Sequence, residues 1–279
     1  MALKYAVSDL LIQSSLMTQL TKIHHSFLRS LQSYDQHAKM QSDIASQLHQ
    51  YFLSELKNVE QFPSMDRVFE IGCGTGFLSK LMLDSLQIEQ FYLNDLVAEC
   101  EPFVRSILEQ NQVNWQFIYG DIKKIDFPEK LNLVCSSSVL QWVQDVPALL
   151  ARARQSMNDN AWFVVSSFTP NHFAEVRYVQ QQLSQPYAEL NYLDKDSWLK
   201  LLDADFEISS IQSSIHQKWF LSVADLLKHL RKTGVNGNAR QQWNQSKMNA
   251  FCQVYEAHFQ SEGKVSLSYA PIYIIARVQ

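Results

Sequence analysis

The stretch Arg67-Val-Phe-Glu-Ile-Gly-Cys-Gly-Thr-Gly76 decides the fold of this chain. Its first five residues predict a short buried strand, and a predicted helix over residues 77–86 follows the glycines. The chain has only 7 glycines in 279 residues, and three of them, Gly72, Gly74 and Gly76, lie in this loop. Glycine lets the backbone turn sharply or approach a ligand closely, so a strand, a glycine loop and a helix in this order indicate a ligand-binding loop. A tight turn without a ligand is the alternative interpretation.

Strand-like runs alternate with helical stretches through the middle of the chain. The strand-like runs lie at residues 67–71, 90–94, 115–119, 131–135, 161–168, 205–216 and 267–278. The helical stretches between the early runs lie at residues 77–86, 101–111 and 146–157. Strands that alternate with helices of this length indicate βαβ units. The sequence therefore predicts an α/β, Rossmann-like fold with a mostly parallel seven-stranded sheet and helices on both faces.

Helical patterns flank this core. Residues 1–60 are expected to form an N-terminal helical extension, because apolar residues recur there at helical spacing without Gly or Pro. Residues 61–279 are expected to form the main domain, with helical insertions at about 170–204 and 218–262. The first insertion is predicted to be mostly helical from 171 to 202, with interruptions at Pro186 and at Asn191-Tyr192, and the second to hold helices at 222–232 and 239–260.

The composition limits the classes of function. With a formal net charge of -4, the chain has no general attraction to nucleic acid or to an anionic membrane. No apolar run approaches the ~18 to 20 residues of a membrane helix, and Lys4 and Asp9 interrupt the N-terminus, so no secretory signal is expected. The four cysteines lack C-x-x-C and metal-ligand spacing, so no metal site is expected. We expect a soluble, cytoplasmic, monomeric protein.

Acidic residues stand at the ends of three successive predicted strands. Glu70 closes the first strand, Asp95 follows the second, and Asp121 follows the third. Because ligands of open α/β sheets bind outside the carboxyl ends of the strands, these carboxylates should converge with the glycine loop on one site. Asp95 comes 19 residues after Gly76, where an acidic residue can accept hydrogen bonds from ribose hydroxyls. A helix cap is the alternative role for Asp95.

The G-x-G-x-G spacing resembles the first motif of class I S-adenosylmethionine-dependent methyltransferases; the dinucleotide fingerprint would place its third glycine one residue later. The resemblance implies S-adenosylmethionine as the cofactor, with Glu70 at its amino acid end, Asp95 at the ribose and Asp121 at the adenine. The helix that carries Tyr34, His37 and Gln41 is the candidate lid. The full predicted cofactor-binding set is Glu70, Gly72, Cys73, Gly74, Gly76, Asp95, Leu96, Asp121, Ile122, Ser137, Tyr34, His37 and Gln41.

Further stretches resemble one family, the malonyl-[acyl-carrier-protein] O-methyltransferases of biotin synthesis. They are F-x-x-S-x-x-S-Y-D-x-H-A-x-x-Q from Phe27 to Gln41, S-V-L-Q-W from Ser138 to Trp142, and LLKHLRKTGVNG from Leu226 to Gly237. The tripeptide at residues 191–193 also has a counterpart in the family. The triple serine at residues 136–138 and the first ~20 residues depart from the family pattern. No N/D-P-P-Y/F motif follows the fourth strand, which disfavours a nucleic acid base as the substrate.

The family resemblance implies methyl transfer to the free carboxylate of malonyl-acyl carrier protein. A carboxylate with an unperturbed pKa of about 4 is already ionised at neutral pH, so no general base is expected. A cation should offset the malonyl carboxylate, and the basic helix at 222–232, continued by Arg240, should dock the acidic carrier. The predicted substrate and carrier residues are Trp142, Arg177, Lys228, Arg231 and Lys232.

Plainer interpretations stay open. Tyr34 and His37 could serve packing and capping, Trp142 could belong to the core, the basic run could be a solvated helix face, and Gly234 could only end a helix. Two other functions also stay open: a methyltransferase for a free small carboxylic acid, which would act without a carrier, and a methyltransferase-like binding protein without turnover. An intact glycine loop and ribose acid disfavour the second.

Overall fold

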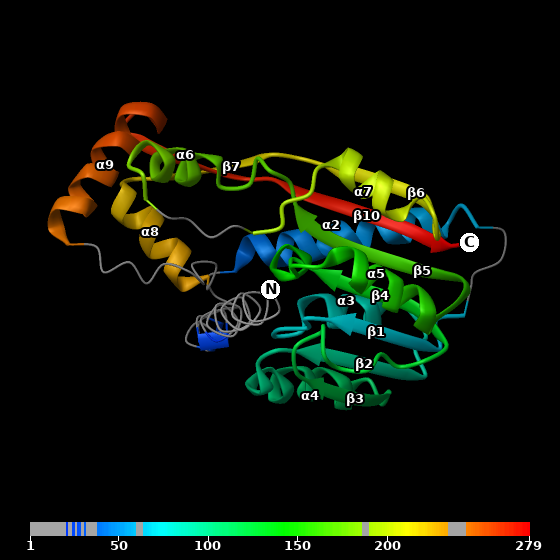
Figure 1. Ribbon diagram of the computed structural model, residues 1–279. Coiled ribbons are helices and arrows are strands. Elements are labelled where there is room, and N and C mark those ends of the chain that lie inside the picture. Colours follow the sequence, from blue (N-terminus) through cyan, green and yellow to red (C-terminus); the bar gives the residue numbers. More distant parts are fainter. Residues whose placement is uncertain are drawn as a thin grey trace, which may run out of the picture. The chain divides into compact units, whose positions relative to one another are not determined.

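The computed structural model describes residues 21, 24, 25, 27, 28, 31, 38–59, 64–185, 190–233 and 244–279 (Figure 1). These residues form two compact units, each described separately. The larger comprises Ala38–Glu175, Glu189–Trp219 and Ser266–Gln279. The smaller comprises the described parts of Met1–His37, Val176–Ala188 and Phe220–Val265.

A seven-stranded sheet is the centre of the larger unit. Its strands are β1 (Arg67–Ile71), β2 (Gln90–Asp95), β3 (Asn114–Tyr119), β4 (Leu131–Ser137), β5 (Met157–Phe168), β6 (Phe206–Ser213) and β10 (Pro271–Val278). They lie in the order β3-β2-β1-β4-β5-β10-β6. The pairs from β3 to β5 are parallel, while β10 runs antiparallel to β5 and β6. The order reverses between β1 and β4, which is where open α/β sheets bind ligands.

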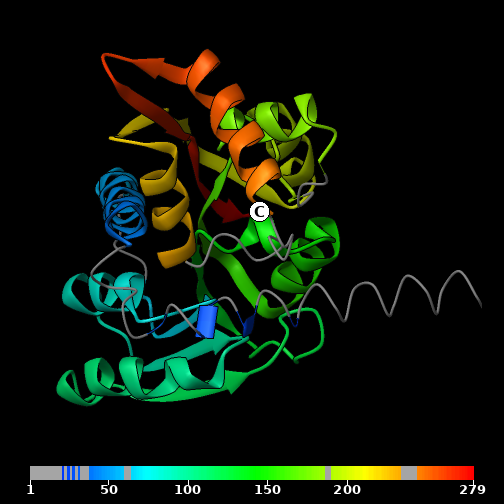
Figure 2. The same cartoon turned by 90° about the vertical axis from the view of Figure 1, so that its left-hand side faces the viewer.

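Helices cover both faces of this sheet. Trp162 and Phe163 are neighbours on β5, so their side chains point to opposite faces. Phe52 of α2 (Lys39–Leu56) packs edge-on against Trp162, with ring centroids 5.5 Å apart. Phe163 belongs to the opposite core cluster, which includes residues of α5 (Val146–Ser156) and α7 (Lys195–Leu202). Figure 2 shows α2 and α5 on opposite sides of the sheet.

The remaining elements of the larger unit connect strands. They are α3 (Phe77–Ser85), η1 (Ala98–Cys100), α4 (Glu101–Gln110) and η2 (Leu140–Trp142). β7 (His216–Phe220), whose last residue belongs to the smaller unit, instead lies beside β9 (Lys264–Tyr269) in a second sheet that also contains β8 (Gln260–Ser261) and has the order β7-β9-β8. No helix among the described residues is long and apolar enough to cross a membrane.

The smaller unit is mainly helical. It contains most of α6 (Ala174–Gln182), and all of α8 (Val223–Lys232), α9 (Gln245–Phe259) and the short strand β8 (Gln260–Ser261), which pairs with the start of β9 (Lys264–Tyr269). Tyr178 of α6 packs edge-on against His258 and Phe259, with ring centroids 4.9 and 5.5 Å away. Ser222 caps α8 by accepting a hydrogen bond from the Asp225 amide at 3.1 Å.

The structure confirms the α/β class and the mostly parallel seven-stranded sheet. Two predictions of strands were wrong. The predicted strands at 205–216 and 267–278 are each two strands, interrupted at residues 214–215 and at Ala270. The stretch at 171–202 is helical in α6 and α7, and residues 190–194 are not helical, in agreement with the predicted interruption at Asn191-Tyr192, while Pro186 lies outside the described residues. The predicted helix at 239–260 is α9 where it is described, and its residues 239–243 lie outside the described part.

Candidate functional site

The glycine loop is hydrogen-bonded to the end of β2. The amides of Gly72 and Cys73 both donate to the Asn94 carbonyl, at 2.8 and 3.0 Å. The Gly74 amide donates to Oδ2 of Asp95 at 2.8 Å. These three bonds hold the loop after β1 and the carboxylate after β2 together at the carboxyl edge, as the sequence predicted for parallel strands.

The three glycines serve different purposes. All have positive φ, +69° at Gly72, +54° at Gly74 and +90° at Gly76. A Cβ on Gly72 would lie 2.4 Å from Cγ2 of Val139, and one on Gly76 would lie 2.6 Å from Cδ1 of Ile107. A Cβ on Gly74 would meet no atom of the described residues within 4 Å. Packing against Val139 therefore excludes a side chain at Gly72. At Gly76 the close atom is the end of the flexible Ile107 side chain, so its positive φ is the stronger reason for glycine, while Gly74 faces space that no described residue fills and in which a ligand could lie.

Glu70 is a buried carboxylate behind this loop. It is 1% exposed, and Oγ of Ser79 donates to its Oε2 at 2.5 Å. Burial raises its pKa from the ordinary 4.5 to about 8, because a charge is poorly solvated there. A cationic ligand group nearby would favour the charged form.

Asp95 is half-buried and holds the backbone on both sides of it. Its Oδ1 accepts from the Val97 amide at 2.9 Å, while its Oδ2 accepts from Gly74. Burial raises the pKa of this carboxyl, and the backbone hydrogen bonds oppose the shift. Each carboxylate oxygen has more than one lone pair, so the side chain can also accept from a ligand hydroxyl.

Asp121 begins the turn after β3. Its Oδ1 accepts from the Lys123 amide at 3.1 Å. Its Oδ2 is buried and has no hydrogen-bond partner among the described residues. Arg152 of α5 supports the turn by donating to the carbonyls of Ile122, at 2.8 Å, and Ile125. A buried acceptor without a partner is costly, so a ligand donor such as an amino group fits here.

The end of β4 is a polar turn. Ser137 Oγ and Ser166 Oγ lie 3.1 Å apart, and Ser166 Oγ also accepts from the Ser138 amide. Ser138 has φ +61°, uncommon for a residue with a side chain. Gln141 donates to the Ser138 carbonyl at 2.6 Å. Ser138 Oγ and Gln141 Oε1 are buried without hydrogen-bond partners in the part of the chain that the structure describes.

Comparison with known proteins identifies the family. Residues 36–211 match the family described as "Methyltransferase domain". Malonyl-[acyl-carrier protein] O-methyltransferase of Acinetobacter baylyi is 34% identical over 255 residues, which cover 90% of this chain and 94% of that protein. This chain belongs to the malonyl-[acyl-carrier protein] O-methyltransferase family.

Other relatives agree in sequence and in fold. The protein of the same name from Haemophilus ducreyi is 32% identical over 251 residues, which cover 89% of this chain and 93% of that one. A putative methyltransferase from Bacillus halodurans has the same fold, with a TM-score of 0.56, 16% identity and coverage of 81% of this chain and 97% of that one.

Residues of the methyltransferase fit S-adenosylmethionine at the carboxyl edge. Among the described residues, nothing fills the space at Gly74 and nothing pairs with Asp121 Oδ2, and the turn at Ser138 is polar. A ligand with a ribose, an amino group and an amino acid part would fit these three features. The structure thus brings together the predicted residues Glu70, Gly72, Cys73, Gly74, Gly76 and Asp95. It places Leu96, Asp121, Ile122 and Ser137 at the ends of neighbouring strands.

The other predicted residues have separate locations. Gln41 lies in the first turn of α2, buried, and its Oε1 has no hydrogen-bond partner among the described residues. Trp142 is half-buried in η2. Tyr34 and His37 lie outside the described residues. Arg177 lies on α6, and Lys228, Arg231 and Lys232 lie on α8, in the smaller unit.

Sequence reasoning missed two supporting residues. Asn94 is 2% exposed, and its Nδ2 donates to the carbonyls of Ile118, at 2.8 Å, and Gly120, at 3.0 Å. Asn94 thereby joins the ends of β1, β2 and β3. The available signal in the sequence was the position of Asn94, a polar residue directly after the apolar residues 91–93 of β2. Arg152, which holds the Asp121 turn, gave no such signal because its partners are carbonyls about 30 residues earlier.

Proposed function

We propose that this protein is an S-adenosylmethionine-dependent carboxyl O-methyltransferase. It methylates the free carboxylate of malonyl-acyl carrier protein, and the malonyl methyl ester enters biotin (pimeloyl) synthesis. The observation that carries the proposal is identity of 34% to a protein of this activity over nine-tenths of the chain. The glycine loop is intact, with open space at Gly74 and acidic groups beside it. These features favour an active enzyme over a methyltransferase-like binding protein without turnover.

The cofactor contacts are assigned as follows. Glu70 meets the ammonium of the amino acid part, directly or through water, and Asp95 accepts from the ribose hydroxyls. Asp121 accepts from the adenine amino group through Oδ2, the atom that has no partner within the described chain. Gly74 leaves room for close approach, and Ser137 and Ser138 border the methionine part. Tyr34, His37 and Gln41 belong to the proposed lid, in an N-terminal extension that ends near residue 60.

Methyl transfer to a carboxylate requires the protein mainly to position the two reactants. Bound S-adenosylmethionine supplies an electrophilic methyl group on a positively charged sulfur. The malonyl carboxylate is already a nucleophile at neutral pH, so no residue has to remove a proton. The protein has to hold a carboxylate oxygen in line with the methyl–sulfur bond and to exclude water that would screen both charges. One of Arg177, Lys228 and Arg231 is the proposed partner of the malonyl carboxylate.

The carrier is proposed to dock on α8. Val223, Leu226 and Leu230 of this helix are buried, while Lys228 and Arg231 are exposed. Acyl carrier proteins are acidic, so an enzyme with net charge -4 needs concentrated positive charge where the carrier approaches. Trp142 is proposed to border the substrate. Neither nucleic acid nor membrane is a proposed partner, and a cytoplasmic monomer is expected.

A direct assay tests the proposed function. The protein is incubated with labelled S-adenosylmethionine and malonyl-acyl carrier protein, and the carrier is analysed by intact mass spectrometry. We expect label on the carrier and a mass gain of one methyl group. Transfer to free malonate at the same rate, without carrier, would instead identify a methyltransferase for small acids, and no transfer to either would identify a binding protein.

A further inference from the structure

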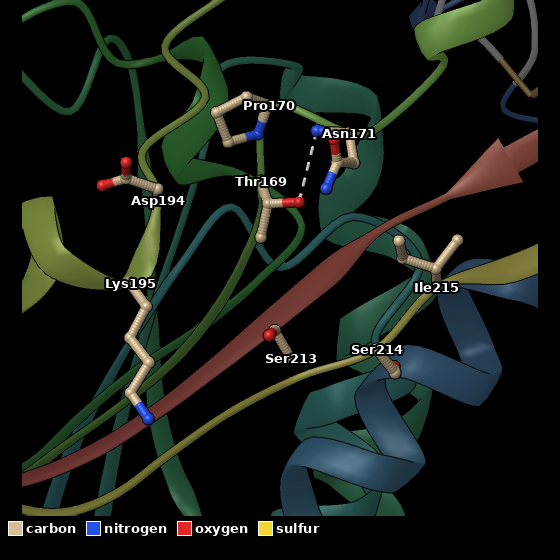
Figure 3. A pocket seen from close by; sticks show the side chains of 8 residues that line it. All are labelled: Thr169, Pro170, Asn171, Asp194, Lys195, Ser213, Ser214 and Ile215. Atoms are coloured by element: carbon tan, nitrogen blue, oxygen red, sulfur yellow. Dashed lines mark hydrogen bonds between the residues drawn. The ribbon is translucent and has the colours of Figure 1, made fainter.

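A cavity of about 570 Å³ lies at the carboxyl edge of the sheet, beyond β5 and β6. Its walls are the turn after β5 (Thr169 to Asn171), the start of α7 (Asp194 and Lys195) and the turn after β6 (Ser213 to Ile215), as Figure 3 shows. The volume is that of an ordinary small-molecule site. None of the cofactor contacts proposed above uses it.

The wall after β5 is fixed by the strands beside it. The Thr169 amide donates to the Ala270 carbonyl at 2.9 Å, and the Ala270 amide donates to Nδ1 of His172 at 3.3 Å. The His172 ring is buried between Phe168 and Phe173, with ring centroids 3.7 and 3.8 Å away. This wall is therefore held in place before any ligand arrives, which lowers the entropic cost of binding.

The lining chemistry suits a long, mostly uncharged ligand. Thr169, Ser213 and Ser214 offer hydroxyls and Asn171 offers an amide, while Ile215 is 58% exposed and offers an apolar surface. Such groups match a molecule that alternates amides and a hydroxyl with branched hydrocarbon.

The two charged groups of the lining point in different directions (Figure 3). The Asp194 carboxylate accepts from the Ser197 amide at 2.8 Å and so caps its own helix. The Lys195 ammonium extends away from that carboxylate and can meet one anionic group of a ligand.

The cavity lies within reach of a malonyl group that is carried on a phosphopantetheine arm. From the end of β4, where the methyl group is proposed to lie, to the end of β6 there are three strand spacings, β4 to β5, β5 to β10 and β10 to β6. At ~4.8 Å each these span about 14 Å. The chain from the phosphorus of a phosphopantetheine arm to the carboxylate oxygen of its malonyl group has the length of between five and six extended residues, roughly 19 to 20 Å, so it spans this distance without being fully extended.

We propose that this cavity receives the phosphopantetheine arm of the acyl carrier protein, an inference that rests on the proposed function. The pantetheine amides and hydroxyl lie against Thr169, Asn171 and Ser213, the branched carbon lies against Ile215, and the phosphate lies near Lys195. The thiol end then points along the sheet edge toward Ser137 at the end of β4. The site explains how malonyl on a carrier is distinguished from free malonate.

Three malonyl thioesters of increasing length test this site: N-acetylcysteamine, pantetheine and phosphopantetheine. In the unmodified enzyme kcat/KM should rise with each step. Ser213→Phe fills the cavity and should lower kcat/KM for the two longer substrates roughly tenfold, with little change for the N-acetylcysteamine thioester. Ser209→Phe is the matched control, since Ser209 is exposed on the same strand and does not line the cavity.

Lys195→Ala tests the phosphate position. It should remove most of the gain in kcat/KM between the pantetheine and phosphopantetheine thioesters, whereas Lys200→Ala on the same helix should leave that gain intact. Equal losses on all three substrates in Ser213→Phe, or no loss on any, would overturn the arm site. If the unmodified enzyme methylates none of the thioesters and not the carrier, the proposed function itself fails.

Discussion

At the residue scale, the Glu70 carboxylate gives the ligand-free protein an unusual dependence on pH. Its pKa is about 8 in the folded state and ordinarily 4.5, so between these values the folded protein binds a proton that the unfolded chain does not. The free energy of unfolding therefore falls as pH rises through this window. S-adenosylmethionine would offset that loss through its ammonium, so the same residue that weakens the ligand-free protein couples stability to cofactor binding.

Glu70→Gln should raise the stability of the ligand-free protein. Gln is uncharged at every pH, so the gain should be small near pH 5 and grow to the order of a few kcal/mol at pH 8, since one pKa unit is about 1.4 kcal/mol. Thermal unfolding at the two pH values checks this, with Glu207→Gln on the exposed face of β6 as the control. The variant should also gain less Tm on addition of S-adenosylmethionine. An unchanged Tm difference between pH 5 and 8 would contradict the assignment.

Asp95→Asn tests the ribose contact. The Asn amide is uncharged and has one oxygen where the carboxylate has two. It can therefore accept a hydrogen bond from the Gly74 amide or from the Val97 amide, but not from both through oxygen. We expect S-adenosylmethionine binding to weaken by roughly 1 to 3 kcal/mol in titration calorimetry, with the domain still folded. Asp95→Ala should weaken binding further and also lower Tm, because both backbone donors lose their acceptor. Unchanged affinity in the folded Asn variant would remove Asp95 from the site.

At the element scale, the glycines of the loop have different roles: Gly72 is needed because of packing, and Gly74 is needed because of the space it leaves for a ligand. Gly74→Ala places a methyl group in open space but at φ +54°, so it combines backbone strain with obstruction of the cofactor. Gly263, between β8 and β9, has φ +72° and also nothing within 4 Å, so Gly263→Ala measures the strain alone. Both variants should lose a similar ~1 kcal/mol or so of stability. Only Gly74→Ala should reduce S-adenosylmethionine affinity, and equal affinities would show that the loop is merely a turn.

Gly72 tests the packing side of the same loop. Gly72→Ala would drive its methyl group into Val139, so it should destabilise the domain by a few kcal/mol through overpacking and positive φ together. Val139→Ala in the same chain should recover part of that loss by removing the clashing methyl groups. Tm of the single and double variants gives the result, and additive losses would show that the clash relaxes elsewhere.

Elements fixed by local pattern could be predicted from the sequence, and elements fixed by distant partners could not. The strand before Gly72 and the helix after Gly76 follow from a short apolar run and three glycines. Pro271 follows Ala270 directly, and proline cannot donate to a strand ladder and restricts the residue before it, so the break at Ala270 had a local signal that the prediction of one strand at 267–278 overlooked. The place of β10 between β5 and β6 in the large sheet had no such signal, because pairing with distant strands fixes it.

In the candidate cofactor site, too, features that depend on distant residues could not be predicted from the sequence. The sequence could predict that Glu70, Asp95 and Asp121 lie at one edge of the sheet, because parallel strands all end at the same edge. The positive φ of Ser138 and the buried bond from Ala270 to His172 depend on residues 28 to 98 positions apart in sequence, and no spacing rule reaches that far. The cavity beyond β5 and β6 was for the same reason not foreseen.

At the scale of the whole molecule, the distribution of charge has to serve a large acidic partner. The net charge is -4, so long-range repulsion would slow the encounter with an acyl carrier protein unless positive charge is concentrated at the docking surface. Lys228 and Arg231 lie exposed on α8, and the apolar side of that helix is buried. We expect Lys228→Glu with Arg231→Glu to raise KM for malonyl-acyl carrier protein several-fold, since electrostatic complementarity acts mainly on association.

Affinity for S-adenosylmethionine should stay unchanged in that double variant, because the proposed cofactor contacts lie at the ends of β1 to β4. Lys57→Glu with Lys130→Glu changes the net charge by the same amount at other exposed positions and separates a local effect from a global one. In the unmodified enzyme, higher salt should raise KM for the carrier in the same direction, since the Debye length is only about 10 Å at 0.1 M. The N-acetylcysteamine thioester keeps the malonyl carboxylate but carries no protein, so the loss on the carrier that exceeds the loss on this thioester measures docking. Equal KM values for the carrier in the two double variants would place the docking surface elsewhere, while leaving methyl transfer itself in place.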